Sequence, residues 1–407
     1  MAVNRKKGAV GISGGVDSAV SALLLKEAGY AVTGVHLYCW PPKSEVEKDG
    51  LTREEWIKKN GCRADEDRQM ALKTALELKI PFKVLDFSEE YNSRVIRSFY
   101  DEYEAGRTPN PDVLCNSEIK FGLFLDWALE NGFDYIATGH YASLQKLKNS
   151  KSQELKLMIP KDKHKDQTYF LWKLTQKELQ HVLFPLGDLL KSEVREIAKK
   201  AELSVADRKD SQGICFVGNV EVKEFLARRL KKKTGKVLDM EGNEVGSHDG
   251  VWFYTIGQRG GWKMNPKAQK RLMYKTGLPR SARNDDSGET PIFYVISKDA
   301  SKNILVVGEA SEAVGDQFEV GEINWIKGSN PDLQGWSLKV RIRHGGELLD
   351  ARCQIIDDRV VVELEKPVRG IASGQSAVFY SEDGEVLGGG VIGWLVEKRT
   401  LGAVNIK

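Results

Sequence analysis

Six consecutive residues near the start of the chain have the composition of an anion-binding loop. Residues 13–18 read Ser-Gly-Gly-Val-Asp-Ser; a short apolar run, residues 8–12, precedes them, and residues 19–28 follow with apolar side chains at helical spacing. A strand, a glycine turn and a helix N-terminus direct backbone N–H groups and the positive helix end toward one point. The two glycines let an anion approach the backbone, and the two serines add hydroxyl donors. We therefore expect this loop to bind phosphate.

Cys115 has the local context of a reactive thiol. It follows a loop, residues 106–114, that two prolines stiffen, and it stands just before a helix that we expect over residues 117–130. A thiol at a helix N-terminus has a lowered pKa and is a better nucleophile. Asp112 lies three residues earlier and could exchange a proton with it. A buried structural cysteine, with Asp112 capping a turn, has the same local pattern, so both interpretations stay open.

Cys215 lies in a glycine-flanked loop, residues 209–218, after a helix expected over residues 192–201. Taken alone, this pattern is more typical of a small buried apolar side chain. The other cysteines have no comparable flanking signature: Cys39, Cys62 and Cys353. Five scattered thiols without a Cys-x-x-Cys pair favour neither a disulfide framework nor a zinc site, and they predict a reducing compartment.

The elements that must position these residues alternate between strand and helix. Strands are expected over residues 8–12, 31–37, 82–87 and 135–139, and helices over residues 19–28, 65–79, 89–105 and 117–130. The polar residues 41–64 are predicted to form an inserted loop. This alternation predicts an α/β unit with a parallel sheet covered on both faces. Ligands bind at the carboxyl ends of such strands, so residues 13–18, the end of 31–37 and the turn at 138–140 should converge on one nucleotide.

The totals describe a chain of two or three domains. It has 407 residues and a net charge of +3, so nucleic-acid contact would depend on local basic patches. No apolar run approaches the roughly 20 residues that span a bilayer, and the N-terminus has no apolar signal segment. We expect a cytoplasmic protein without a membrane partner.

The second half of the chain changes character. Residues 222–233 are predicted to form a helix whose basic end is either a solvated face or a phosphate-contacting patch. Residues 266–290 have the composition of a linker. From residue 293 onward, short alternating apolar runs predict an antiparallel barrel of six to eight strands. The expected domains are therefore a catalytic domain (1–217), a small mixed domain (218–290) and a β-barrel (291–407).

Residues 13–18 resemble the PP-loop, SGGxDS, of ATP pyrophosphatases, which split ATP into AMP and pyrophosphate. Further motifs resemble the tRNA-specific 2-thiouridylases of the MnmA type and occur in that family's order: SGGVDS, TPNPDVLCNSEIKF, ATGHYA, KDQTYFL, FPLGD, KDSQGICF, YTIGQRGG and GQSAVFY. Together they span residue 10 to about residue 390. PP-loop enzymes with other substrates share only the first motif, so the combination is specific.

The resemblance implies a reaction and its substrates. ATP would adenylate the C2 oxygen of the wobble uridine of tRNA with release of pyrophosphate, and a cysteine persulfide would then replace AMP with sulfur. Phosphate chemistry of this kind also favours Mg²⁺ as a cofactor. The implied partners are tRNA and a sulfur-relay persulfide donor protein or a cysteine desulfurase.

The resemblance also implies a role for each matching residue. ATP would be held by Gly11, Ile12, Ser13, Gly14, Gly15, Val16, Asp17, Ser18, Leu37 and Gly139. Asn110, Pro111 and Asp112 would face the target base. Cys115 would be the nucleophile, with Asp112 assisting its protonation, and Cys215 would carry the persulfide. The residues implied to contact tRNA are His140, Lys165, Asp166, Gln167, Arg341, Ile342 and Gln375.

Three stretches depart from the family pattern. Residues 37–40 read Leu-Tyr-Cys-Trp where the family commonly has Met-Lys-Asn-Trp, and the insertion at residues 41–61 is longer than usual. An expected Arg-Tyr pair reads Arg341-Ile342, which removes a stacking tyrosine, although Arg343 and His344 could compensate.

Three other functions remain open at this stage. An amide-forming synthetase that uses ammonia would share the PP-loop but would need no cysteine. A non-catalytic RNA-binding protein could retain an ATP-sensing fold. An iron–sulfur cluster could be held by Cys115, Cys215 and a third ligand such as Cys62.

Overall fold

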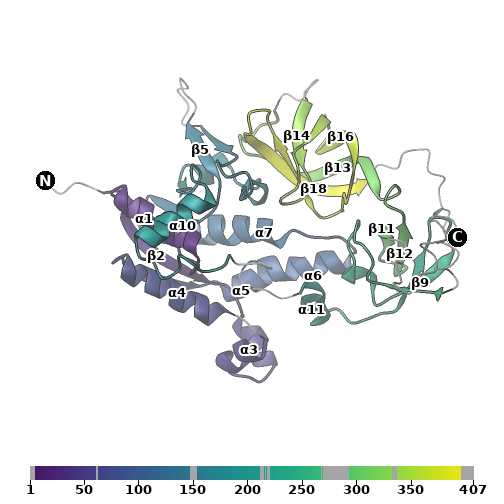
Figure 1. The fold of residues 1–407 in the computed structure, drawn as a ribbon, viewed down its shortest axis with the longest axis horizontal. Helices are drawn as coiled ribbons and strands as arrows, with labels where there is room; N and C mark the ends of the chain where they lie inside the picture. The colour runs from purple at the N-terminus through teal and green to yellow at the C-terminus, as the bar shows by residue number, and fades with distance from the viewer. Residues whose placement is uncertain are drawn as a thin grey trace.

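The computed structural model describes residues 5–60, 63–146, 154–210, 215, 217, 221–266, 268, 293–331 and 337–395. An N-terminal α/β unit forms one end of the elongated molecule, a middle sheet forms the other, and a closed barrel lies over the helices between them (Figure 1). Most of the predicted linker at 266–290, and Cys62, lie outside the described residues. Within the described ranges, no helix has the length and apolarity needed to cross a bilayer.

The N-terminal unit is built on a parallel sheet with strand order β3-β2-β1-β4-β7. Its strands are β1 (Lys7–Gly11), β2 (Ala31–Tyr38), β3 (Phe82–Asp86), β4 (Tyr135–Ala137) and β7 (Val182–Leu183). The predicted α/β class and the first four strands are confirmed, whereas β7 is too short for a sequence pattern to reveal. The register places the carboxyl ends of β1, β2 and β4 at one edge of the sheet.

Helices cover both faces of this sheet. Ala9 and Val10 of β1 are both fully buried but belong to different apolar clusters, because side chains alternate across a strand. The Val10 face is covered by α1 (Val16–Glu27), α4 (Ala64–Glu77) and α10 (Lys191–Lys200). The Ala9 face is covered by α5 (Ser88–Tyr91), the π-helical turn Asn92–Ile96, α6 (Arg97–Glu104) and α8 (Phe124–Glu130).

The helix that carries Cys115 begins earlier than predicted. Asn110 caps α7 (Pro111–Leu114), a π-helical segment Cys115–Leu123 follows, and α8 continues without a break. Pro111 occupies the first helical position, where a missing N–H has no cost. The prediction that Cys115 precedes a helix starting near residue 117 is therefore wrong, because the thiol lies one turn inside the helix.

The prediction that residues 41–64 form a loop is wrong, because this polar stretch contains α2 (Lys43–Lys48) and α3 (Arg53–Asn60). Trp56 of α3 is buried and packs edge-on against Trp40, with ring centroids 5.9 Å apart. Because each helix buries one apolar side chain, Val46 of α2 and Trp56 of α3, the stretch lacks helical periodicity. The predicted helix at 222–233 is also shorter, since α11 spans Val222–Ala227. Arg229, in the basic run after it, pairs with Glu45 of α2.

The middle sheet has strand order β10-β9-β8-β12-β11, and the barrel closes in the order β13-β16-β15-β14-β17-β18. The middle strands are β8 (Gly235–Leu238), β9 (Glu244–His248), β10 (Lys263–Met264), β11 (Tyr294–Asp299) and β12 (Ile304–Gly308). The barrel strands are β13 (Val314–Trp325), β14 (Ser337–Arg341), β15 (Leu349–Ile356), β16 (Arg359–Arg369), β17 (Ser376–Tyr380) and β18 (Val386–Leu395).

The predicted antiparallel barrel is confirmed, with six strands. The assignment of β11 and β12 to it is wrong, because β12 pairs with β8 in the middle sheet. Alternating apolar patterns give the face of a strand but not its partner. The domain boundaries at 217/218 and 290/291 stay predictions, although this pairing favours a middle unit that continues to Gly308.

The barrel is docked on the segment that connects β4 and β7 of the N-terminal sheet. This segment contains the hairpin β5 (Ser143–Lys146) and β6 (Leu155–Met158), the 3-10 turn Thr168–Phe170 and α9 (Gln176–Leu179). Tyr169 Oη donates to the Ser376 carbonyl at 2.9 Å, and Trp172 Nε1 donates to Ser376 Oγ at 3.0 Å. Arg341 Nη1 reaches Asp166 Oδ2 at 2.6 Å, and both side chains are more than nine-tenths buried. A buried ion pair thus joins the barrel to the N-terminal unit.

Replacing Arg341 with Met is expected to destabilise the protein, because it leaves Asp166 buried without its charge partner. Such losses cost about 3–5 kcal/mol, or several degrees in melting temperature. Calorimetric melting of Arg341→Met, of the double variant Asp166→Asn/Arg341→Met and of Arg359→Met measures this. The double variant should recover much of the loss, and the exposed Arg359–Glu319 pair should matter little. A melting temperature for Arg341→Met equal to that of Arg359→Met would contradict the expectation.

Candidate active site

The loop between β1 and α1 is closed by its own serines. Ser13 N donates to Ser18 Oγ at 3.1 Å, and Ser18 Oγ donates to the Gly15 carbonyl at 3.1 Å. Gly14 has φ +85°, and a Cβ there would lie 2.6 Å from the Asp67 carbonyl oxygen, so only glycine fits. Gly15 forms the N-cap of α1, which leaves the first N–H groups of the helix available to an anion. This geometry suits a phosphate group.

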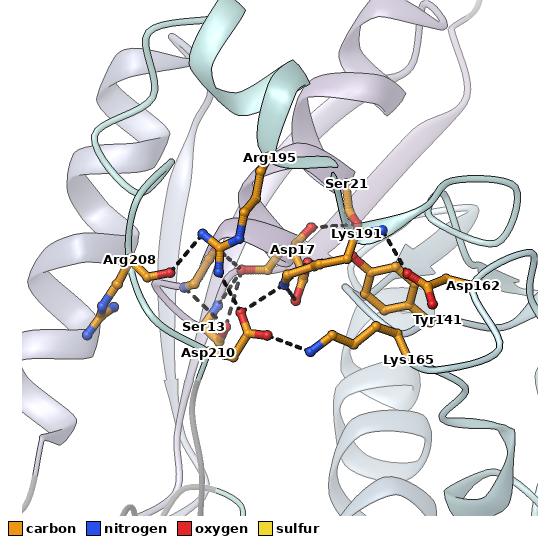
Figure 2. A network of polar contacts seen from close by, with 12 residues as sticks. Ser13, Asp17, Ser21, Tyr141, Asp162, Lys165, Lys191, Arg195, Arg208 and Asp210 are labelled. Carbon is orange, nitrogen blue, oxygen red and sulfur yellow. Dashed lines mark hydrogen bonds and ion pairs between the residues drawn. The ribbon is translucent and has the colours of Figure 1, made fainter. Parts of the chain in front are cut away.

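Asp17, in the first turn of α1, is held by groups from distant parts of the chain (Figure 2). Lys191 Nζ lies 2.7 Å from each carboxylate oxygen of Asp17, and Tyr141 Oη donates to Asp17 Oδ1 at 2.9 Å. Lys191 also contacts Asp210 Oδ1 at 2.9 Å. A cation is thereby fixed beside the anion-binding loop, in a position where it can attract phosphate.

Asp210 lies five residues before Cys215 and is surrounded by cations. Lys165 Nζ lies 2.7 Å from Asp210 Oδ2, and Arg195 Nη2 lies 3.0 Å from Oδ1. Burial alone would raise the pKa of Asp210, but the hydrogen bonds from Lys165 and Lys191 outweigh it and lower that pKa to about 2. Through Lys191, the segment that leads to Cys215 is tied to the anion-binding loop.

Local sequence patterns do not reveal Lys191, Arg208 and Tyr141 as residues of this site. Arg208 Nη1 donates to the Gly14 carbonyl, and Arg208 Nη2 lies 2.6 Å from Asp67 Oδ1. None of the three lies within a hundred residues of the loop in sequence, so no local spacing could connect them with it. The position of Lys191 at the start of a helix was the only sequence signal.

The strand ends meet as predicted. A Cβ on Gly139, two residues after β4, would lie 2.7 Å from Ser18 N, so this turn touches the anion-binding loop directly. Leu37 is buried near the carboxyl end of β2, and Ile12 N donates to the Val35 carbonyl at 2.8 Å. The residues predicted to bind ATP therefore lie at one edge of the sheet, while their role stays a prediction.

The structure brings Cys115 and Cys215 together across 100 residues of sequence. Cys115 Sγ donates to Cys215 Sγ at 3.5 Å, and Cys215 N donates to Asp112 Oδ1 at 3.3 Å. Tyr91 Oη donates a hydrogen bond to the Cys215 carbonyl at 2.5 Å. Cys115 is fully buried and Cys215 is partly exposed. This pair lies close enough for sulfur to pass between the two thiols with a small movement.

The two thiols have opposite electrostatic character. Burial raises the pKa of Cys115 well above its usual value, and donation to Cys215 raises it further. The hydrogen bond from Cys115 lowers the pKa of Cys215 against the effect of burial, and the nearby Lys120 ammonium lowers it further. The expectation that Cys115 has a lowered pKa is therefore wrong, since its position inside a buried helix removes the helix-end effect. Cys215 is the thiol favoured as thiolate.

Asp112 and Cys39 complete the surroundings of the pair. Burial raises the pKa of Asp112, which makes its carboxylate a stronger base than a solvent-exposed one. Cys39 follows the carboxyl end of β2 and is buried; burial raises its pKa, and so does the nearby Cys215. The thiol pair and the anion-binding loop therefore lie near the same edge of the sheet. Within the described ranges, no group of three metal-ligating side chains occurs.

A cavity of about 450 Å³ lies beside the loop before Cys115. Pro109, Asn110, Val113 and Leu114 line it on one side, and barrel residues line it on the other. Of the residues predicted to face the target base, Asn110 lines this cavity and Asp112 contacts Cys215. Their contact with a base stays a prediction.

The residues predicted to contact tRNA make contacts within the protein. Lys165 pairs with Asp210, Asp166 with Arg341, and Gln167 Oε1 accepts from Tyr141 N. His140 and Ile342 are buried, and Gln375 Nε2 donates to two carbonyls of the loop before Asn110. Burial lowers the pKa of His140 well below its usual value, so this ring is neutral near pH 7. tRNA contact by this set stays a prediction.

Three family profiles match successive parts of this chain. Residues 6–219 match the tRNA methyl transferase HUP domain, residues 223–309 the tRNA methyl transferase PRC-barrel domain, and residues 315–392 the aminomethyltransferase beta-barrel domain. These profiles are named after methyl transfer, whereas the full-length relatives are named for thiolation.

Two such relatives are the tRNA-specific 2-thiouridylases MnmA of Streptococcus sanguinis and Shouchella clausii. Each is 40% identical over 94% of this chain, covering 94% and 95% of the relative. Among solved structures, a 4-thiouridine synthetase–RNA complex with bound ATP is 17% identical, with a TM-score of 0.31, over 55% of this chain and 50% of that chain. A score this low carries no argument about activity.

The two thiols are expected to titrate far apart, Cys215 below and Cys115 above an ordinary cysteine. Because a lowered pKa keeps the thiolate present to lower pH, the pH midpoint of Cys215 alkylation should be the lower one. Peptide mass spectrometry after iodoacetamide treatment measures both midpoints. Lys120→Met should raise the Cys215 midpoint by removing a nearby cation, whereas the exposed Lys177→Met should not. Equal midpoints for the two cysteines would show that this asymmetry is absent.

Proposed function

Because the chain belongs to the tRNA-specific 2-thiouridylases, which are tRNA sulfurtransferases, we propose that it replaces the C2 oxygen of the wobble uridine with sulfur in two chemical stages. One observation carries the mechanism: two thiols of opposite electrostatic character lie 3.5 Å apart near the sheet edge that holds an anion-binding loop. An ammonia-using synthetase or a plain RNA-binding protein would leave this pair without a role.

The first stage is adenylation of the uridine. The C2 oxygen attacks the α-phosphorus of ATP, a new O–P bond forms, and pyrophosphate leaves with the electrons of the broken P–O bond. The N–H groups of residues 13–18 and the Lys191 ammonium stabilise the negative charge that develops on the phosphates. Adenylation is needed because uridine C2 is a poor electrophile, whereas AMP is a good leaving group.

Mg²⁺ would assist this stage by neutralising pyrophosphate. Asp17 is the loop carboxylate suited to such an ion, but Lys191 already contacts both of its oxygens. The ion would therefore be held mostly by phosphate oxygens.

The second stage transfers sulfur. Cys215, as the thiolate, accepts a sulfane sulfur from a persulfide donor protein or a cysteine desulfurase. The terminal sulfur of the Cys215 persulfide attacks C2, a C–S bond forms, and AMP leaves with the electrons of the C–O bond. The uridine is then joined to Cys215 through an S–S bond.

Cys115 resolves that bond. It gives its proton to Asp112 and attacks the Cys215 sulfur, and the electrons of the old S–S bond remain on the sulfur at C2. The products are 2-thiouridine and a Cys115–Cys215 disulfide. The sulfane sulfur gains two electrons and the two thiols lose two, so an external dithiol must reduce the disulfide before the next turnover. This need for a reducing thiol pool is why we place the enzyme in the cytoplasm.

Replacing either cysteine with Ser should stop thiolation while leaving adenylation intact. Cys115→Ser and Cys215→Ser are expected to lower the rate of 2-thiouridine formation by at least about 10³-fold, as loss of a nucleophile does. The rate is measured by mass spectrometry of tRNA nucleosides after incubation with ATP and a persulfide donor. Cys353→Ala, in the barrel core, is the matched control.

Pyrophosphate release stimulated by tRNA should persist in both variants. No stimulation in the unaltered enzyme would favour a non-catalytic RNA-binding protein. Normal thiolation by one of the variants would remove the proposed role of that cysteine.

Lys191→Met should weaken ATP binding. Loss of one charge-assisted contact costs about 1.5–3 kcal/mol, which corresponds to a roughly 10- to 150-fold higher KM for ATP. The KM is measured from tRNA-dependent pyrophosphate release at varied ATP concentration. Lys199→Met, on the exposed side of the same helix, is the control. An unchanged KM for Lys191→Met would mean that this ammonium does not contact the phosphates.

A further inference from the structure

The loop that leads to Cys115 is hydrogen-bonded to a turn of the barrel. Gln375 Nε2 donates to the Thr108 carbonyl at 3.0 Å and to the Pro109 carbonyl at 3.1 Å. Thr108 N donates to the Ser373 carbonyl at 2.8 Å. Three hydrogen bonds thus join two segments that are more than 260 residues apart in sequence. We call residues 372–375 the barrel turn and residues 106–112 the catalytic loop.

The barrel turn is itself rigidly held. Ile392 N donates to the Gln375 carbonyl at 2.7 Å, and Gly374 N donates to the Ile392 carbonyl at 2.9 Å, so the turn is tied to β18. Gly374 has φ +91°, and a Cβ there would lie 2.9 Å from Thr108 N. The close approach of the barrel turn to the backbone of Thr108 therefore depends on glycine at position 374.

The middle unit also contacts the catalytic loop, through Ala300 and Thr255. A Cβ on Gly106 would lie 2.9 Å from Ala300 Cβ, in the turn between β11 and β12. Thr108 Oγ1 donates to Thr255 Oγ1 at 3.5 Å, and Thr108 is almost fully buried. Thr108 is therefore a point at which the N-terminal unit, the middle unit and the barrel are in contact.

The path from Thr108 to the thiols is short and stiff. Pro109 and Pro111 restrict the backbone between Thr108 and the start of α7. Asp112, the residue after Pro111, accepts a hydrogen bond from Cys215 N. A displacement of the loop at Thr108 would therefore move Asp112, and with it the contact between Cys115 and Cys215.

We propose that Gln375 is a positioning residue, which holds the catalytic loop so that Asp112, Cys115 and Cys215 keep the geometry that sulfur transfer needs. The inference rests on the proposed function, because it concerns the same thiols. It differs from the tRNA contact that the family resemblance implies for Gln375. The two donors of its amide are directed at two carbonyls of the loop, so both donors are satisfied within the protein.

Two variants test this role. Gln375→Met removes the donors and keeps the length of the side chain, and Gln375→Glu keeps its shape but directs an oxygen at the two carbonyls. Both should lower kcat for thiolation by about tenfold or more with KM for tRNA changed less than about twofold, because a misplaced catalytic group slows chemistry rather than binding. The exposed Gln354→Met, on β15 of the same barrel, is the matched control.

A second readout needs neither ATP nor tRNA. The pH midpoint of Cys215 alkylation, measured on its tryptic peptide, should rise in both variants, since a shifted loop weakens the hydrogen bond from Cys115. If thiolation itself were not the activity, this measurement would still decide the role of Gln375. A raised KM for tRNA with unchanged kcat and an unchanged midpoint would overturn the proposal in favour of a tRNA contact. No change in any quantity, in a variant that melts like the control, would also overturn it.

Discussion

The contact between a buried thiol, Cys115, and a partly exposed one, Cys215, is the constraint on which the candidate active site depends. Cys115 is fully buried and donates to Cys215, whose backbone N–H is in turn held by Asp112. Desolvation keeps Cys115 as a thiol, and donation from that thiol stabilises Cys215 as a thiolate. One hydrogen bond therefore helps to shift the pKa values of two identical side chains in opposite directions. The sulfur carrier and the resolving thiol of the proposed mechanism need this difference.

The charges around the pair and around the anion-binding loop follow the same logic. Near the thiols, Lys120 supplies a positive charge; burial lowers its pKa, but the neighbouring Cys215 and Cys115 outweigh burial, so the ammonium stays protonated. Beside the loop, Lys191 bridges Asp17 and Asp210 (Figure 2). Lys191 is held by carboxylates from two other segments, so little reorganisation is needed when negative charge develops beside it.

Much of this positioning comes from outside the N-terminal unit. The barrel lies over α6 and α7 (Figure 1). Its Arg341 contacts Asp166 and its Gln375 contacts the Thr108 carbonyl, and both partners belong to the N-terminal unit. The Arg341–Asp166 pair contributes more to the specific docking of the barrel than to the net free energy of folding, because the desolvation cost of the two charges offsets most of their Coulomb attraction. The three units therefore act as one structural assembly around residues 106–115.

By itself the sequence determined the α/β class, the first four strands, the glycine loop and the presence of a barrel, because these depend on local spacing and periodicity. It could not place β11 and β12, since an alternating pattern does not specify a partner strand. It missed the helices at residues 43–60, each of which buries one apolar side chain. It also assigned the lowered pKa to the wrong thiol, because burial and the neighbouring sulfur are tertiary properties. Only the fold brought together Lys191 with Asp17, Gln375 with Thr108, and the two cysteines, since each contact joins segments that the chain itself separates by a hundred residues or more.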